Sequence, residues 1–109
     1  MSLNVEVNFD KDKNQLVVIP QGDIDIYTSN KFKEKVLDSF KNNQGDISID
    51  ACNLEYVDST GLGALISILK NVKESDNEIF ISNLKPNIRK LFDITELDKL
   101  FTIRGEGDE

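Results

Sequence analysis

The chain has 109 residues, the length of one domain, with 13 Lys and Arg, 20 Asp and Glu, a formal net charge of −7 and no histidine. Without histidine it can form no Ser-His-Asp or Cys-His nucleophile system and offers zinc no imidazole, and its acidity argues against nucleic acid and anionic membranes as partners. Its single cysteine allows neither an intramolecular disulfide nor a cysteine metal cluster.

The chain is expected to open with a β-hairpin. Apolar and polar residues alternate over residues 5–9, which indicates a half-buried strand, and the apolar residues 16–19 indicate a second strand after a polar turn. Pro20 cannot donate a ladder hydrogen bond, so it is expected at a strand end or a sheet edge. The first residues lack the basic and apolar regions of a signal peptide, and no run is apolar enough to span a membrane, so a cytoplasmic domain is expected.

A helix is expected after an acidic loop at residues 22–25. Thr28 or Ser29 can cap it, and Gly45 suits a left-handed residue at its end. The apolar residues of this helix recur at helical spacing: Phe32, Val36, Leu37 and Phe40.

The second half of the chain continues the alternation of strands and helices. Ile47 and Ile49 indicate a third strand, and residues 79–81 a fourth. Between them, after Asp58, an apolar stripe predicts a helix: Leu62, Leu65, Ile66, Leu69 and Val72.

The C-terminal part predicts two more helices and a last strand. Pro86 fits the first turn of a helix, Thr95 could cap a further short one, and residues 101–103 could form an edge strand before a frayed acidic tail at 104–109. This order predicts an α/β fold with a mixed sheet of four to five strands that opens with a hairpin, right-handed crossovers, and helices packed mainly on one face.

Residues 58–63, Asp-Ser-Thr-Gly-Leu-Gly, are the strongest candidate for a functional segment. A Ser or Thr at a helix start is ordinarily an N-cap, and that explains the hydroxyls. Gly61 and Gly63 each cost about 1 kcal/mol relative to Ala in a helix interior, so we expect them to allow close approach of the sheet or of a second molecule. The segment completes neither Gly-x-Gly-x-x-Gly nor Gly-x-x-x-x-Gly-Lys-Ser/Thr, the glycine motifs that hold a bound nucleotide. A covalent phosphate on Ser59 would add about −1.5 to −2 charge beside Asp58, with little basic residue nearby, and would disturb a docking surface.

Three other features have an ordinary structural explanation that we favour. Asp23 and Asp25 could form an acid/base pair or bind Mg²⁺, but no third ligand is apparent and acids are also common near a helix start. Cys52 follows a strand and is expected to be small, buried and unreactive. The basic run at residues 85–90 is expected to be a solvated helix face and not an anion site.

Taken in order, four segments resemble the STAS domain family. They are residues 22–25 followed by Thr28, residues 58–63, residues 83–92, and residues 93–101, where Glu96 stands in place of the usual Gly. The resemblance covers roughly residues 3–103, so the chain is identified as a single STAS-type domain over residues 1–109, with that core.

The sequence offers no base suited to neutral pH, no metal cluster and no complete cofactor motif, so neither an enzyme nor a cofactor is expected. The resemblance is strongest to stand-alone bacterial anti-sigma factor antagonists. It implies that the unphosphorylated protein binds an anti-sigma factor with serine kinase activity and so releases a sigma factor. Phosphorylation of Ser59 would end binding, and a metal-dependent serine phosphatase would reset the cycle. Neither nucleic acid nor membrane is expected as a direct partner.

The resemblance also implies which residues surround the phosphoacceptor Ser59. The expected partner-binding residues are Asp23, Asp25, Thr28, Asp58, Thr60, Gly61, Leu62 and Gly63. One alternative is a STAS scaffold component of a sensory assembly that controls no sigma factor directly. Another is a receiver-like phospho-Asp domain with Mg²⁺ at Asp23, Asp25 and Asp58, which the opening hairpin disfavours.

Overall fold

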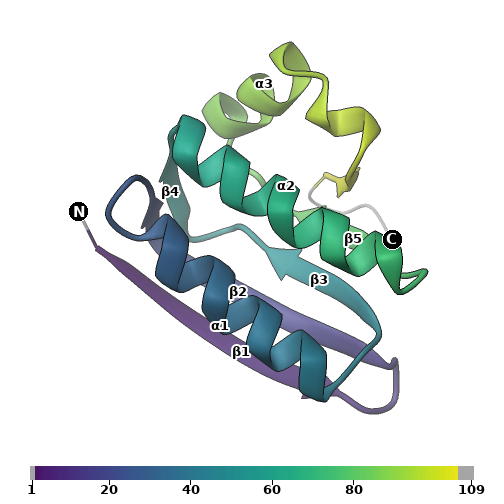
Figure 1. The fold of residues 1–109 in the computed structure, drawn as a ribbon. Helices are drawn as coiled ribbons and strands as arrows, with labels where there is room; N and C mark the ends of the chain where they lie inside the picture. Colours follow the sequence, from purple (N-terminus) through teal and green to yellow (C-terminus); the bar gives the residue numbers. More distant parts are fainter. Residues whose placement is uncertain (1, 106–109) are drawn as a thin grey trace.

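The computed structural model describes residues 2–105 and confirms the α/β class (Figure 1). In chain order its elements are β1 (Leu3–Asp10), β2 (Gln15–Ile24), α1 (Ser29–Asn42), β3 (Asp46–Asp50), β4 (Leu54–Val57), α2 (Ser59–Glu74), β5 (Ile79–Ser82), α3 (Pro86–Ile94), the 3₁₀ turn η1 (Leu97–Lys99) and β6 (Thr102–Arg104). The expected opening hairpin and the alternation of strands and helices are both present. No helix in this part of the chain combines the length and apolar character needed to cross a membrane.

The strands of residues 2–105 form one mixed sheet. Its order is β1-β2-β3-β5-β6, and β4 also pairs with β2. β1 runs antiparallel to β2, and the other pairs are parallel. The sheet therefore has six strands, one more than the upper expectation, because residues 54–57 form β4. That strand is short, and its burial does not alternate, so periodicity could not reveal it.

Pro20 lies inside β2, which corrects the expectation of a strand end or a sheet edge. β3 pairs with residues 15–18 of β2, and β4 pairs with residues 22–24. Pro20 falls in the gap between these two partners, where no ladder donor is needed on that side of the strand. Its side chain is fully buried.

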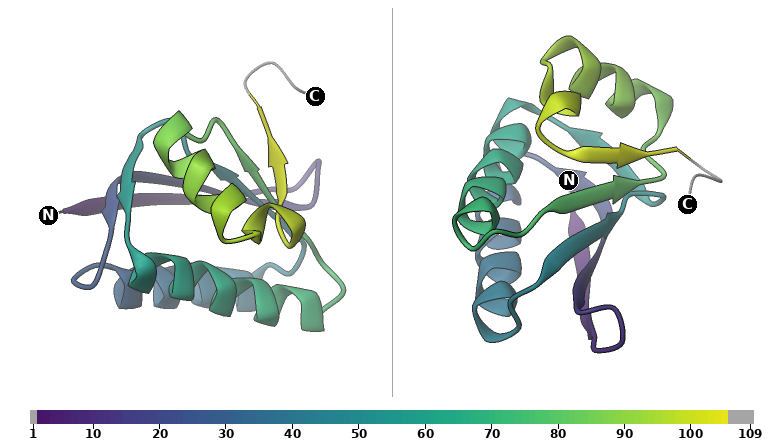
Figure 2. Two further views of the ribbon diagram at one scale, coloured as in Figure 1. Left: turned by 90° about the horizontal axis from the view of Figure 1, so that it is seen from above. Right: turned by 90° about the vertical axis from the view of Figure 1, so that its right-hand side faces the viewer.

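The core lies between the sheet and helices α1 and α2, and it extends to α3 and η1, where Ile88, Phe92 and Leu97 are buried. α1 and α2 lie side by side on one face of the sheet, while α3 and η1 lie at the end formed by β5 and β6 (Figure 2). Most of the predicted apolar residues are buried in one cluster that includes Val18, Ile24, Phe32, Val36, Ile47, Ile68, Val72, Ile79 and Phe92. Helical periodicity therefore identified most of the buried faces of α1 and α2, although Leu37 and Ile66 are only partly buried and the fully buried Ile68 was not predicted.

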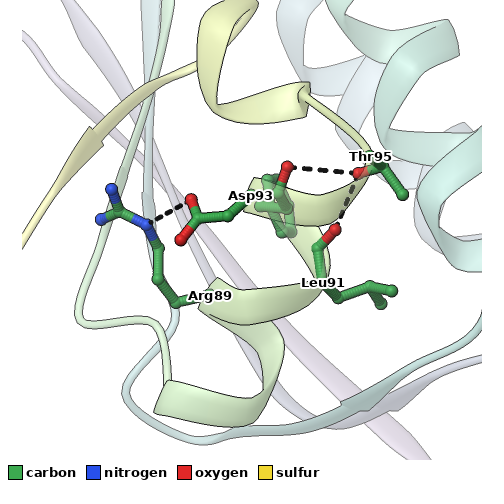
Figure 3. A network of polar contacts seen from close by, with 5 residues as sticks. Arg89, Leu91, Asp93 and Thr95 are labelled. Atoms are coloured by element: carbon green, nitrogen blue, oxygen red, sulfur yellow. Dashed lines mark hydrogen bonds and ion pairs between the residues drawn. The ribbon is translucent and has the colours of Figure 1, made fainter.

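Two expected helix ends differ in the structure. Gly45 has no positive φ; a Cβ there would collide with the carbonyl oxygen of Asn14, so the glycine is explained by close approach. Thr95 does not cap the following turn. Its hydroxyl donates to the carbonyl of Leu91 at 2.8 Å and so closes α3, with the Phe92 carbonyl 3.3 Å away (Figure 3).

The C-terminal strand is shifted by one residue, from the expected 101–103 to Thr102–Arg104. Arg104 belongs to β6, and its guanidinium carbon lies 4.5 Å from the centre of the Phe80 ring, which is a cation–π contact. The proposed frayed tail therefore does not include Arg104, and its residues 106–109 lie outside the described part of the chain.

Candidate functional site

The predicted site lies where β2 and β4 end next to each other. Ile24 pairs in register with Val57, and the backbone N–H of Asp58 donates to the Ile24 carbonyl at 3.3 Å. The loop at residues 25–28, which follows β2, is therefore adjacent to the start of α2. The two acidic segments that were selected separately from the sequence meet at one corner of the molecule.

Asp58 is the N-cap of α2 and connects the helix to this loop. Its Oδ1 accepts from the Thr60 hydroxyl and, at 2.9 Å, from the Gly61 N–H, while its Oδ2 accepts from the Ile26 N–H at 3.2 Å. The hydrogen bonds from Thr60, Gly61 and Ile26 hold the pKa of Asp58 below its usual range, so the carboxylate is ionised at neutral pH. The cap is an aspartate, so the interpretation of Ser59 or Thr60 as the capping residue is wrong.

Ser59 and Thr60 are both exposed but differ in their hydrogen bonding. The Thr60 hydroxyl donates to Asp58, whereas the Ser59 hydroxyl makes no hydrogen bond with any other residue between 2 and 105. Ser59 is the first residue of α2, so its side chain stands at the positive end of the helix dipole. Of these two adjacent hydroxyls, the one on Ser59 is exposed and makes no hydrogen bond with the described part of the chain.

The segment's other residues divide between the core and the surface. A Cβ on Gly61 would collide with the Ile24 carbonyl oxygen and lie 2.9 Å from Val57 Cγ1, so this glycine allows α2 to approach the sheet. Leu62 is buried in the core. A Cβ on Gly63 would meet nothing within 4 Å, and this position is exposed. Of these two glycines, Gly63 is therefore the one that leaves the backbone open to a second molecule.

Asp25 and Thr28 stabilise the loop from inside. Asp25 is 3% exposed, and its Oδ1 accepts from the backbone N–H groups of Tyr27 at 2.9 Å and Thr28 at 3.2 Å. The Thr28 hydroxyl donates to the Asp23 carbonyl at 2.7 Å and accepts from the Asp25 N–H at 2.9 Å. Thr28 occupies the N-cap position of α1, but its side chain makes no capping hydrogen bond, contrary to expectation. These residues shape the loop and offer a partner little surface.

The carboxylates of this corner do not form a metal cluster in the part of the chain that the structure describes. Oδ1 of Asp25 is turned into its own loop, and Oδ2 is buried without a hydrogen-bond partner among residues 2–105. Asp23 is half-buried in β2, where it pairs with Tyr56 of β4.

Three surface residues beside the segment were missed in the sequence analysis. Ile26 and Tyr27 are 65% and 79% exposed at the tip of the loop. Their signal was present in the sequence, since two large apolar residues follow the acidic segment directly. Lys33 has no such signal: with α1 folded against α2, it lines a small groove together with Ser29, Asn30, Thr60, Gly63 and Ala64. A basic side chain therefore lies nearer to the segment than its sequence neighbours suggested.

The two remaining candidate features lie elsewhere. Cys52 is exposed, which corrects the expectation of burial, but local desolvation and the neighbouring Asp50 raise the pKa of its thiol and so disfavour the reactive thiolate. In the basic run, Lys85 lies 3.4 Å from Glu55, and Arg89 lies 3.0 Å from Asp93 (Figure 3). These pairs agree with a solvated helix face.

Comparison with known proteins gives concordant matches. The family model described as the STAS domain matches residues 6–109. The anti-sigma-B factor antagonist of Staphylococcus epidermidis is 32% identical over 109 residues, which is 100% of this chain and 98% of the relative.

Two solved proteins share the fold. A candidate anti-sigma factor antagonist from Thermotoga maritima superimposes with a TM-score of 0.82 at 22% identity, over 91% of this chain and 84% of the other. The anti-sigma factor antagonist SpoIIAA of Bacillus has been solved in unphosphorylated and phosphorylated forms. Its phosphorylated form superimposes with a TM-score of 0.71 at 17% identity, over 93% of this chain and 91% of the other.

Proposed function

Because the chain belongs to the STAS domain family, we propose that it is an anti-sigma factor antagonist whose binding is switched off by phosphorylation of Ser59. In its unphosphorylated form it binds an anti-sigma factor that is also a serine kinase, and a sigma factor is released. It acts in the cytoplasm as a binding protein and as the kinase's substrate. The full-length match to a named anti-sigma-B factor antagonist supports the antagonist role, and the phosphorylated form of SpoIIAA supports the switch.

The state of the Ser59 hydroxyl is the observation that carries the proposal. It is exposed at the first position of α2 and has no hydrogen bond within residues 2–105. The neighbouring Thr60 hydroxyl already donates to the Asp58 carboxylate, so that carboxylate competes with an incoming base for its proton. This difference favours Ser59 over Thr60 as the phosphoacceptor.

The phosphoryl transfer needs a base and a nucleotide from the kinase. The Ser59 Oγ attacks the γ-phosphorus of ATP, a new O–P bond forms, the bond from the γ-phosphorus to the bridging oxygen breaks, and ADP leaves. The hydroxyl proton goes to a base of the kinase, because hydrogen bonds from Thr60, Gly61 and Ile26 lower the pKa of Asp58 and make its carboxylate a weak base. A serine phosphatase then hydrolyses the phosphoester and restores the hydroxyl.

The phosphate opposes binding through local electrostatics. It adds about −1.5 to −2 charge next to the ionised Asp58, in a chain that already carries a net charge of −7. An interface formed against a neutral hydroxyl must then desolvate a dianion beside a carboxylate. A difference of about 1.4 kcal/mol already changes affinity tenfold, so a modest penalty suffices for a switch.

Phosphosite mapping tests this proposal. The protein is incubated with its cognate anti-sigma factor kinase and ATP and is then analysed by mass spectrometry, alongside Ser59→Ala and the matched variant Thr60→Val. We expect one phosphate on Ser59, none in Ser59→Ala, and full phosphorylation of Thr60→Val. Phosphate at another residue, or no phosphate with a kinase that is active on a control substrate, would overturn the assignment.

A further inference from the structure

The loop beside Ser59 exposes two consecutive large apolar side chains. Five large hydrophobic residues are exposed in the described part of the chain: Ile26, Tyr27, Tyr56, Ile94 and Leu100. Of these, only Ile26 and Tyr27 are neighbours in the sequence. Single exposed hydrophobic residues are normal on a protein surface, whereas contiguous exposed apolar surface marks sites of contact with other molecules.

This loop is held in one conformation by hydrogen bonds. Every backbone N–H from Asp25 to Ser29 has an acceptor within residues 2–105. Asp25 donates to the Thr28 hydroxyl, Tyr27 to Asp25 Oδ1, and Thr28 and Ser29 to the Asp25 carbonyl at 3.1 and 2.8 Å. A loop that is already ordered loses little conformational entropy on binding, so the exposed side chains are presented at low cost.

The backbone N–H of Ile26, the remaining donor of this loop, connects the loop to the segment that carries Ser59. The Ile26 N–H donates to Oδ2 of Asp58, the residue immediately before Ser59. A typical interface buries about 800 Å² per partner, which corresponds to a patch of about 16 Å radius. A patch of this size centred on Ser59 also covers Ile26, which is one hydrogen bond and one residue away.

We propose that Ile26 and Tyr27 form the apolar anchor that the anti-sigma factor binds, and that Asp58 positions this anchor relative to Ser59. The inference rests on the proposed function and deepens it by assigning the contacts that provide affinity. The partner presents an apolar pocket beside the site that receives Ser59. Asp58 acts as a positioning residue, because its carboxylate accepts hydrogen bonds from the loop and from the helix start but none from the Ser59 hydroxyl in the described part of the chain.

Alanine substitutions with a matched control test the anchor. Ile26→Ala and Tyr27→Ala are compared with Ile94→Ala, which removes an equally exposed isoleucine, 70% against 65%, at the end of α3. Binding to the unphosphorylated protein is measured by calorimetry and folding by thermal melting. We expect each loop variant to weaken binding by about tenfold or more and Ile94→Ala to leave it unchanged, with the folding of all three intact.

Equal binding by the loop variants and Ile94→Ala would overturn the anchor while leaving the proposed function standing. A wild-type protein that binds no anti-sigma factor would overturn the proposed function, and the inference with it.

The variant Asp58→Asn tests the positioning role. Its amide oxygen can still accept from the Gly61 N–H, but the amide nitrogen is a donor and cannot accept from the Ile26 N–H. We expect faster hydrogen exchange at the Ile26 amide, retained protection at Gly61, and weaker binding. Unchanged exchange at Ile26, or faster exchange with unchanged binding, would show that Asp58 does not position the anchor.

Discussion

Gly61 and Gly63 are two residues apart in α2 but face different surroundings. A side chain on Gly61 would be forced against the Ile24 carbonyl and Val57, whereas one on Gly63 would enter open space. We therefore expect Gly61→Ala to destabilise the protein by about 1–3 kcal/mol through overpacking. Gly63→Ala should stabilise it by about 0.5–1 kcal/mol, because alanine restricts the unfolded chain and favours the helix. Urea denaturation of both variants measures these changes.

The same pair of variants separates stability from binding. If the partner's backbone approaches α2 at Gly63, then Gly63→Ala should bind the anti-sigma factor more weakly although it is more stable than the wild type. Binding equal to that of the wild type would show that Gly63 lies outside the interface. Stabilisation by Gly61→Ala would contradict the close contact between α2 and β2.

Asp50 offers a prediction about pH dependence. Burial disfavours its ionised form, but hydrogen bonds at 3.1 Å from the Asn83 side chain and the Cys52 N–H outweigh this and lower the pKa of Asp50. A carboxylate whose pKa is lower in the folded protein than in the unfolded chain stabilises the fold at pH values above its unfolded pKa of about 3.9. That stability is lost as the pH falls through its folded pKa. Asp50→Asn should therefore be less stable than the wild type at neutral pH, by about 1 kcal/mol, and the difference should shrink in acid.

The measurement is the free energy of unfolding of the wild type and of Asp50→Asn, from neutral pH down into acid below the unfolded pKa. Asp38→Asn controls for the loss of one carboxylate, because Asp38 is exposed on α1 and makes no hydrogen bond with residues 2–105. A difference between wild type and Asp50→Asn that stays constant into acid would contradict the lowered pKa.

At the scale of elements, periodicity predicted the structures that bury a regular face. The stripes around Val36 in α1 and Leu65 in α2 are dictated by helical geometry, so they are visible without tertiary information. β4 was missed because it is stabilised by pairing with β2 and not by an alternating pattern of its own. Pro20 was misplaced for the same reason, since only the division of one β2 edge between two partners creates a gap that tolerates it.

The candidate site shows the same division between local and tertiary information. Its position at a helix start could be predicted, because an apolar helical stripe begins after Asp58 and residues able to cap a helix precede it. The arrangement of its hydrogen bonds could not, because the Asp58 carboxylate is shared between its own helix and Ile26 of a loop that is distant in the sequence. Asp25 makes the local hydrogen bonds of an Asx turn to the N–H groups of Tyr27 and Thr28, but its burial depends on the fold around the loop.

The junction between α3 and η1 contains a strained residue. Glu96 follows the last turn of α3 with φ 61°, a left-handed conformation that costs a residue with a Cβ about 1–2 kcal/mol. Glycine is the usual residue after a helix end with this geometry. We expect Glu96→Gly to raise the melting temperature by a few degrees, since about 1 kcal/mol shifts a domain of this size by that amount.

Glu96→Ala is the control for the lost side chain. Glu96 also contacts Lys99 at 2.6 Å, but both side chains are mostly exposed, so this ion pair contributes at most about 1 kcal/mol. Glu96→Ala removes the ion pair and keeps the strained φ, so it should be no more stable than the wild type. Equal melting temperatures for the Gly and Ala variants would show that the backbone conformation carries no cost.

At the scale of the whole molecule, the net charge of −7 and a charge placed at Ser59 affect the binding of a partner in different ways. The overall charge acts at long range and is screened by salt, with a Debye length of about 10 Å at 0.1 M and about 3 Å at 1 M. A charge at Ser59 acts in contact with Asp58 and with desolvated partner groups, where ions do not enter. The dependence of binding affinity on salt concentration can therefore distinguish these two electrostatic effects.

We expect Ser59→Ala to retain binding to the anti-sigma factor and Ser59→Asp to weaken it, because the aspartate places a second carboxylate beside Asp58. Gln44→Glu adds the same charge at an exposed position beyond the opposite end of α1, about 20 Å along the helix, and should have only a small effect that disappears at about 1 M salt. If contact and desolvation govern the switch, the loss caused by Ser59→Asp persists at that salt concentration when affinities are measured by calorimetry. A loss that vanishes together with that of Gln44→Glu would mean that the phosphate acts through the overall charge of the molecule. Equal affinity of Ser59→Ala and Ser59→Asp at low salt would contradict charge gating altogether.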